Sequence, residues 1–177
     1  MMHSFVKYPL LPSLLLSCIV FSLLCSAKMV TVGDICSKHP NPNSCDKILN
    51  TIPGISEGAD INSLSSYLIN EAHVNAFDSL TLIHNIIANS TNTQFKLRYG
   101  SCSLDYNDVL ECLTQAKESF SSKNFSAMKS NGAVVVKDAQ DCDTKAYDSP
   151  QLRLNNQDLV DTAIIITILA DFLAGKY

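Results

Sequence analysis

The cysteines are the residues whose type and spacing carry the clearest chemistry. Seven occur, and Cys18 and Cys25 lie in an apolar N-terminal stretch that we expect to be removed. In a secreted domain the remaining thiols are expected to pair as disulfides. Two bridges would leave one thiol free, and the sequence alone allows every pairing among the five residues Cys36, Cys45, Cys102, Cys112 and Cys142.

Catalytic chemistry is not expected from the remaining residues. The sequence has no glycine-rich phosphate loop, no H-E-x-x-H and no C-x-x-C, and we expect no serine-hydrolase elbow. His73 and His84 stand eleven residues apart, about 16 Å along a helix, so one metal cannot bridge them. We therefore expect no enzyme, no cofactor and no metal site.

Charge and composition exclude further classes of partner. Charged residues make up 17% of the chain, hydrophobic residues 46%, and the net charge is −4. Removal of Lys7 with the N-terminal stretch leaves 12 basic and 17 acidic residues, so the mature charge is 12 − 17 = −5. An acidic chain without a basic cluster is a poor match for nucleic acids or anionic membranes.

The N-terminus has the layout of a secretory signal. Residues 10–24 are mostly apolar, and small residues follow up to Ala27, where we expect cleavage. The apolar run is shorter than the roughly 20 residues that a membrane anchor needs. A secreted protein can carry glycans, and the two sequons in the mature part begin at Asn89 and Asn124.

Helical periodicity dominates the mature chain. Apolar residues recur every three or four positions over 62–89, 102–120, 125–142 and from about 156 to 174. Short polar stretches separate these segments, so neighbouring helices should be antiparallel. The sequence predicts an all-α, up-and-down four-helix bundle over 60–177. The broad apolar side of the last helix predicts that it is the most buried.

A short segment, 28–55, precedes the bundle. It is rich in proline and carries Cys36 and Cys45, which suits a small helical hairpin closed by a disulfide. Cys102 and Cys142 both fall on the inward stripes of helices expected to be antiparallel neighbours. Helix geometry therefore favours Cys36–Cys45 and Cys102–Cys142, with Cys112 unpaired and available for a dimer if the protein is not a monomer.

Three stretches resemble plant pectin methylesterase inhibitors, in the family that also contains invertase inhibitors. Residues 34–45 resemble the family's opening I-C-x-K-T-x-N-P-S-x-C, and residues 96–106 resemble the R-Y-x-x-C-x-x-x-Y part of the family's L-x-x-R-Y-x-x-C-x-x-x-Y. Gln115-Ala116-Lys117 follows in register, and Cys142 takes the place of the fourth cysteine. The resemblance covers nearly all of the mature chain, and its N-P string leans toward the pectin methylesterase branch.

The resemblance implies a four-helix bundle with a hairpin outside it, and disulfides that join the first cysteine to the second and the third to the fourth. It implies a secreted cell-wall protein that docks on the rim of the substrate cleft of pectin methylesterase and blocks the entry of pectin. Asp108 and Glu111, three apart and therefore on one helix face, are the best candidate contacts. The weaker candidates on the preceding helix are Asn75, Asp78 and Thr81.

Other functions remain open at this point. An inhibitor of acid invertase is the first alternative, although the Pro-Lys-Phe string of some invertase inhibitors is absent. A non-inhibitory helical bundle is the second. A secreted lipid carrier would need a hollow core and usually a denser cysteine set, which the full apolar stripes disfavour.

Overall fold

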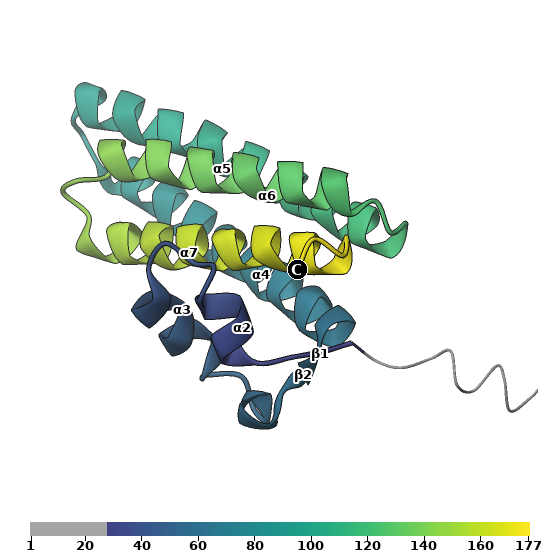
Figure 1. Ribbon diagram of the computed structural model, residues 1–177. Helices are drawn as coiled ribbons and strands as arrows, with labels where there is room; N and C mark the ends of the chain where they lie inside the picture. The colour runs from purple at the N-terminus through teal and green to yellow at the C-terminus, as the bar shows by residue number, and fades with distance from the viewer. Residues whose placement is uncertain (1–27) are drawn as a thin grey trace, which may run out of the picture.

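The computed structural model describes residues 28–177, and the signal peptide expected at 1–27 lies outside the described residues. Consecutive long helices run antiparallel through short turns, and the first also packs against the last, which closes an up-and-down bundle (Figure 1). The predicted all-helical class is therefore confirmed. The four helices are α4 (Ile61–Asn89), α5 (Thr93–Ser121), α6 (Phe125–Lys145) and α7 (Pro150–Leu173).

Each long helix begins at a polar residue whose side chain accepts a hydrogen bond from a backbone N–H of the first turn. The four caps are Asp60, Asn92, Asn124 and Ser149. Such caps satisfy N–H groups that have no partner inside the helix.

Two helix starts differ from the sequence expectation. The cap at Asn92 starts α5 at Thr93, inside a stretch expected to be irregular. Ser149 is followed by Pro150 at the first helical position, a favourable site for proline, so α7 begins there and not near Asn156.

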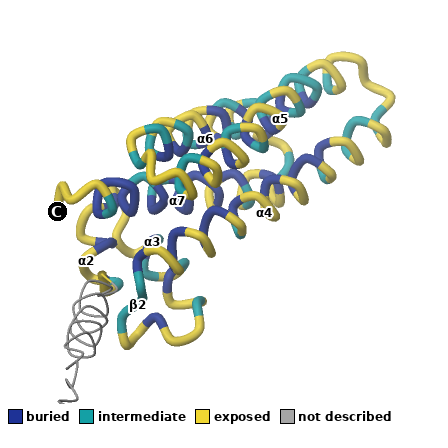
Figure 2. Tube along the Cα trace, turned by 90° about the vertical axis from the view of Figure 1, so that its right-hand side faces the viewer, coloured by how far each residue is buried: buried dark blue, intermediate teal, exposed yellow. Residues whose placement is uncertain are grey.

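The core follows the apolar stripes, and α7 is its centre. Fourteen of the 24 residues of α7 are buried, more than in any other described helix. The bundle covers one side of α7 and the N-terminal hairpin covers the other. Figure 2 shows buried positions along the inner sides of the helices and exposed positions facing outward. None of the helices between residues 28 and 177 is long and apolar enough to cross a membrane.

The N-terminal hairpin consists of α2 (Val32–Cys36) and α3 (Pro42–Leu49). Thr31 and Asp34 form a reciprocal capping box at the start of α2, and Asn41 caps α3. A disulfide joins Cys36 to Cys45, with 5.5 Å between their Cα atoms. The hairpin is outside the four-helix bundle, but it lies directly against α7 (Figure 1).

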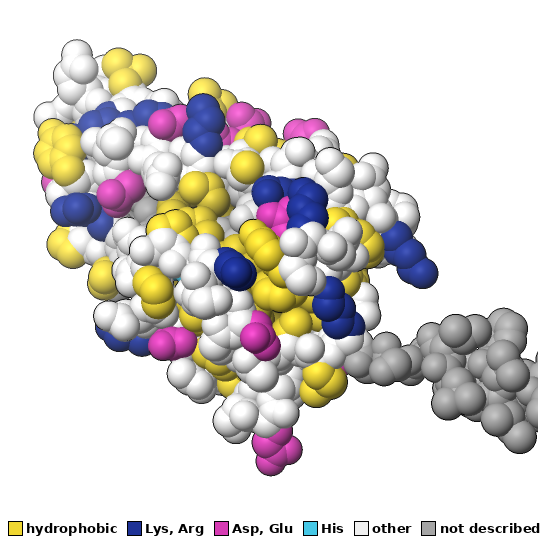
Figure 3. All heavy atoms as spheres, viewed as in Figure 1, with side chains coloured by type: hydrophobic (Ala, Val, Ile, Leu, Met, Phe, Trp, Pro, Cys, Tyr) yellow, Lys and Arg dark blue, Asp and Glu magenta, His cyan; other side chains and the backbone are white. Residues whose placement is uncertain are grey.

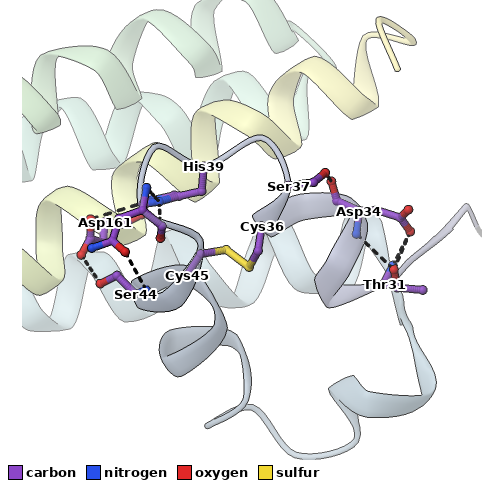
Figure 4. Close-up of a disulfide and its surroundings, with 9 residues drawn as sticks. Thr31, Asp34, Cys36, Ser37, His39, Ser44, Cys45 and Asp161 are labelled. Atoms are coloured by element: carbon purple, nitrogen blue, oxygen red, sulfur yellow. Dashed lines mark hydrogen bonds and ion pairs between the residues drawn. A yellow bond between two sulfur atoms is a disulfide. The ribbon is translucent and has the colours of Figure 1, made fainter.

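A buried polar contact fixes the hairpin to α7, as Figure 4 shows. His39 and Asp161 are both nearly inaccessible to solvent. The Nε2 atom of His39 lies 3.3 Å from the carbonyl oxygen of Asp161, and the Ser44 hydroxyl donates a hydrogen bond to the Asp161 carboxylate. Because buried polar groups must be paired, these contacts select one position for the hairpin on α7.

A minimal sheet ties the start of the described chain to the start of α4. It consists of β1 (Met29–Val30) and β2 (Ala59–Asp60), which pair antiparallel with Met29 opposite Asp60. A 3₁₀ turn, η1 (Ile55–Glu57), precedes β2. Strands of two residues are too short to show alternation, so the sequence did not indicate them.

Candidate partner-binding surface

Asp108 and Glu111 are both exposed on the outer side of α5, away from its buried stripe. Neither carboxylate forms an ion pair with a described residue. The Oε1 atom of Glu111 accepts a hydrogen bond of 3.0 Å from the Gln115 side chain. The two carboxylates therefore present uncompensated negative charge to solvent.

The structure does not bring all five predicted contact residues together. Asn75 and Asp78 are exposed on α4, but they line a hollow that α4 forms with α7. Thr81 is also exposed, and its hydroxyl donates to the carbonyl of Phe77 within the same helix. The candidates on α4 thus belong to a different surface from the pair on α5.

The sequence reasoning missed the acidic residues that α6 adds beside Asp108 and Glu111. Asp138 is 7% exposed, and the half-buried Cys112 side chain lies within the electrostatic influence of Asp138, Glu111 and Asp108. We call this surface the α5–α6 face. Its residues are Asp105, Asp108, Glu111, Cys112, Lys137, Asp138, Asp141 and Lys145.

Lysines on α6 neutralise part of the α5–α6 face. The Lys137 ammonium lies 2.6 Å from Asp141 and 3.1 Å from Asp138, and Lys145 lies 2.6 Å from Asp105. The hydrogen bonds that the Lys137 ammonium donates to Asp141 and Asp138 raise the pKa of Lys137. The i,i+4 spacing of Lys137 and Asp141 is a signal from which this pair could have been found in the sequence. Figure 3 shows the molecule from the same side as Figure 1, and acidic and basic side chains are interspersed over that side as well.

Cys112 is the unpaired cysteine among residues 28–177. Burial is the main cause that raises the pKa of its thiol, and the charges of Asp138, Glu111 and Asp108 raise it further. The reactive thiolate is therefore disfavoured at neutral pH. The other bridge, Cys102–Cys142, joins α5 to α6 with 4.7 Å between Cα atoms.

Arg98 and Tyr99, the R-Y pair of the sequence motif, have a structural role. Both side chains contact the turn between α6 and α7. Arg98 pairs with the Asp148 carboxylate and lies 4.3 Å from the ring centroid of Tyr147. The Tyr99 hydroxyl donates to Asp148 at 2.6 Å. Burial raises the pKa of Tyr99 to about 12, with a further contribution from Asp148. These residues hold the turn against the start of α5.

No arrangement of catalytic groups accompanies these surfaces in the described residues. The string G-x-S-x-G, which marks such an elbow in serine hydrolases, nevertheless occurs at 54–58. It spans η1, where Ser56 is exposed and follows a turn after α3 and not a strand, so it is not a nucleophile elbow. His73 is exposed, and the Nε2 atom of His84 is within hydrogen-bond distance, 2.9 Å, of the Ser103 hydroxyl oxygen. No group of three metal-ligating side chains occurs between residues 28 and 177.

The two sequon asparagines lie at opposite ends of the bundle. Asn89 is the last residue of α4, and Asn124 caps α6 by accepting a hydrogen bond of 3.1 Å from the Ala127 N–H. Both side chains are exposed.

Comparison with known proteins identifies a family and a relative that this chain resembles. A family model described as plant invertase/pectin methylesterase inhibitor matches residues 30–166. A pectinesterase inhibitor from Actinidia deliciosa is 26% identical over 185 residues, which cover 99% of this chain and 100% of that protein.

Two solved structures share the fold. A mutant form of a pectin methylesterase inhibitor from Arabidopsis superposes with a TM-score of 0.72 at 22% identity, over 79% of this chain and 95% of that one. A pectin methylesterase inhibitor from Arabidopsis thaliana gives 0.62 at 21% identity, over 80% and 95%. With its bundle, its disulfide-closed hairpin and a family match over most of its length, the chain belongs to the plant invertase/pectin methylesterase inhibitor family, whose members are inhibitors of enzymes and not enzymes.

Proposed function

We propose that this protein is a secreted inhibitor of pectin methylesterase. The observation that carries the proposal is the end-to-end relationship to the Actinidia pectinesterase inhibitor, which covers 99% of this chain and all of that protein. The relationship includes both the hairpin and the bundle. Inhibition by docking requires no catalytic group.

The α5–α6 face is the surface through which we propose that the enzyme is bound. Asp108 and Glu111 are exposed there without ion-pair partners, so both carboxylates are available to donors on another protein. The Cys102–Cys142 bridge ties the two helices of this face together. A rigid surface loses little conformational entropy on binding, which favours affinity.

The proposed mechanism is steric. The face would dock on the rim of the enzyme's substrate cleft, where it would block the entry of pectin without a chemical step. Asn75, Asp78 and Thr81 lie off this face and would contribute less.

The proposed location is the plant cell wall, reached through removal of residues 1–27. Two disulfides support an oxidising compartment. Glycans at Asn89 and Asn124 would project from opposite ends of the bundle, where they would leave the middle of the α5–α6 face accessible. We propose a monomer, because the thiol of Cys112 is half-buried and poorly disposed to link two copies.

Acid invertase is the second candidate target, since the family model covers inhibitors of both enzymes. Formation of a stable complex with one enzyme and not the other distinguishes the two candidate targets. The folded part of the chain, 28–177, would be mixed with a plant pectin methylesterase or with a plant acid invertase and passed over a size-exclusion column at mildly acidic pH.

We expect a shifted peak that contains both proteins with pectin methylesterase and separate peaks with invertase. A complex with invertase alone would assign the chain to the other branch. Separate peaks with both enzymes would leave a non-inhibitory bundle as the function.

A further inference from the structure

Two leucines on the outer side of α5 are left largely uncovered by the rest of the described chain. Leu97 is 65% exposed, and Leu104 is 67% exposed, the largest fraction of any large apolar side chain among residues 28–177. Neither residue belongs to the buried stripe of α5, so neither contributes to the core. We call these two residues the leucine stripe.

The leucine stripe is continuous with the α5–α6 face. Seven residues make almost two turns of a helix, so Leu97, Leu104 and Glu111 follow one another along the same side of α5. Asp108 comes four residues after Leu104 and is therefore its neighbour on that side. The uncompensated carboxylates that we propose as enzyme contacts thus adjoin exposed apolar surface.

A further exposed apolar residue borders the carboxylates from α6. Val134 is 39% exposed and comes four residues before Asp138, the acid whose charge acts on the Cys112 thiol. Because α5 and α6 are antiparallel, Val134 lies toward the end of the face that is remote from Leu104. The two free carboxylates of α5 therefore have an apolar side chain on either side of them.

The charge of the α5–α6 face indicates what kind of surface can cover it. The face contains five acidic residues and two lysines, so its net charge is 2 − 5 = −3. A second copy of the chain would bring two such faces together and would be repelled, and an anionic membrane would be repelled for the same reason. A protein surface that combines an apolar patch with basic side chains complements both the leucines and the acids.

We propose that the leucine stripe is the apolar anchor of the contact with pectin methylesterase, an inference that rests on the proposed function. Leu104 would be buried against an apolar patch of the enzyme, and Asp108 and Glu111 would pair with basic side chains at the border of that patch. Protein interfaces combine an apolar centre with a polar rim, and a few buried residues supply most of the affinity. The carboxylates would mainly speed association, and the leucines would mainly slow dissociation.

Surface plasmon resonance of the folded chain on immobilised plant pectin methylesterase, at mildly acidic pH, separates these two contributions. Leu104→Asn keeps a branched side chain but makes it polar, and should weaken binding about tenfold through faster dissociation. Leu97→Asn should act in the same direction. Leu104→Met keeps an apolar side chain of similar volume and should bind within about threefold of the parent chain.

Leu154→Asn is the matched control. Leu154 is 62% exposed on α7, which lies diagonally across the bundle from α5. This variant makes the same change to an exposed leucine away from the α5–α6 face, so its affinity for the enzyme should equal that of the parent chain.

Salt dependence provides a second readout. The affinity lost in the double variant Asp108→Asn with Glu111→Gln should shrink at high salt, because salt screens exposed charges, whereas the loss in Leu104→Asn should stay the same. The anchor is overturned if the parent binds and Leu104→Asn binds as tightly, or if Leu154→Asn weakens binding equally, and the proposed function then still stands. Absence of binding by the parent chain would overturn the function and the anchor together.

Discussion

At the scale of single residues, charge compensation separates the acids that maintain the fold from those available to a partner. Asp141 and Asp138 share Lys137, Asp105 pairs with Lys145, and Asp171 pairs with Lys129 and Lys176. Asp108 and Glu111 lie among such pairs without a cation of their own. That difference, together with their position on the α5–α6 face, identifies them as candidate contacts.

Cys112 offers a prediction about reactivity. Burial and three nearby carboxylates raise the pKa of its thiol, so it should react with a maleimide at mildly alkaline pH much more slowly than the same thiol in the unfolded chain. Asp138→Asn should speed the reaction, because it removes a charge that opposes the thiolate, whereas Glu118→Gln should not. If Cys112 reacts with the maleimide as fast in the folded protein as in the unfolded chain, the raised pKa of its thiol is contradicted.

Asn124 is both a sequon residue and a helix cap, and the two roles can be separated. Asn124→Ala removes both, and should lower the free energy of unfolding by about 1 kcal/mol. Asn124→Ser keeps a cap and should cost only a few tenths of that, while Ser126→Ala removes the sequon alone. Thermal melts of unglycosylated protein provide the measurement, and equal melting of the Ala and Ser variants would refute the capping role.

At the scale of elements, α6 and α7 approach closely at Gly132. A Cβ atom built there would lie 2.9 Å from Cγ2 of Thr167 on α7, whereas one built at Gly100 on α5 meets nothing within 4 Å. Gly100→Ala should therefore stabilise the protein by up to about 1 kcal/mol through helix propensity. Gly132→Ala should destabilise it despite the same gain.

Thr167→Ser provides the compensating variant for Gly132→Ala. Serine lacks Cγ2 but keeps the hydroxyl that donates to the Ile164 carbonyl at 2.8 Å. The double variant should recover most of the stability lost in Gly132→Ala, as measured by denaturant unfolding. If Gly132→Ala is as stable as Gly100→Ala, the close approach of the two helices is wrong.

The helices themselves could be predicted because the periodicity of a helix is a local feature of the sequence. The signals that determine helix boundaries and contacts between helices are only partly local. The cap at Ser149 and the proline after it carry the signal for the start of α7, although the apolar pattern begins later. The contact between His39 and Asp161 joins positions 122 residues apart, and no local pattern encodes it. The arrangement of the helices around the core decides which neighbouring helix Asn75 and Asp78 face. Their separation from Asp108 could therefore be recognised only in the structure.

At the scale of the whole molecule, ion pairs make stability depend on pH. Hydrogen bonding from Lys137 lowers the pKa of Asp141. Burial alone would raise the pKa values of Asp148 and Asp171, but hydrogen bonds from Tyr99 and Arg98, and from Lys129 and Lys176, outweigh it and lower both. The folded state therefore binds fewer protons than the unfolded chain at acidic pH.

The sign of the effect follows from these lowered values. The stabilisation is fully present above the ordinary aspartate range, near pH 4, and is lost as the pH falls through the lowered pKa values. We expect the melting temperature to fall steadily below about pH 4, and Asp171→Asn to be less stable at neutral pH but less sensitive to acid. Parallel melting curves for the variant and the parent across this range would contradict the prediction.

The central claim, that the molecule inhibits pectin methylesterase through its α5–α6 face, is tested most directly by an inhibition titration. Release of methanol from pectin would be followed as the folded chain is added to a fixed concentration of the enzyme at mildly acidic pH. We predict loss of activity near equimolar inhibitor, a weaker effect from Asp108→Asn combined with Glu111→Gln, and no change from Glu57→Gln, which removes an exposed acid on η1, outside the bundle. Full activity at a large excess of the parent chain would contradict the function, and equal inhibition by the double variant would contradict the face.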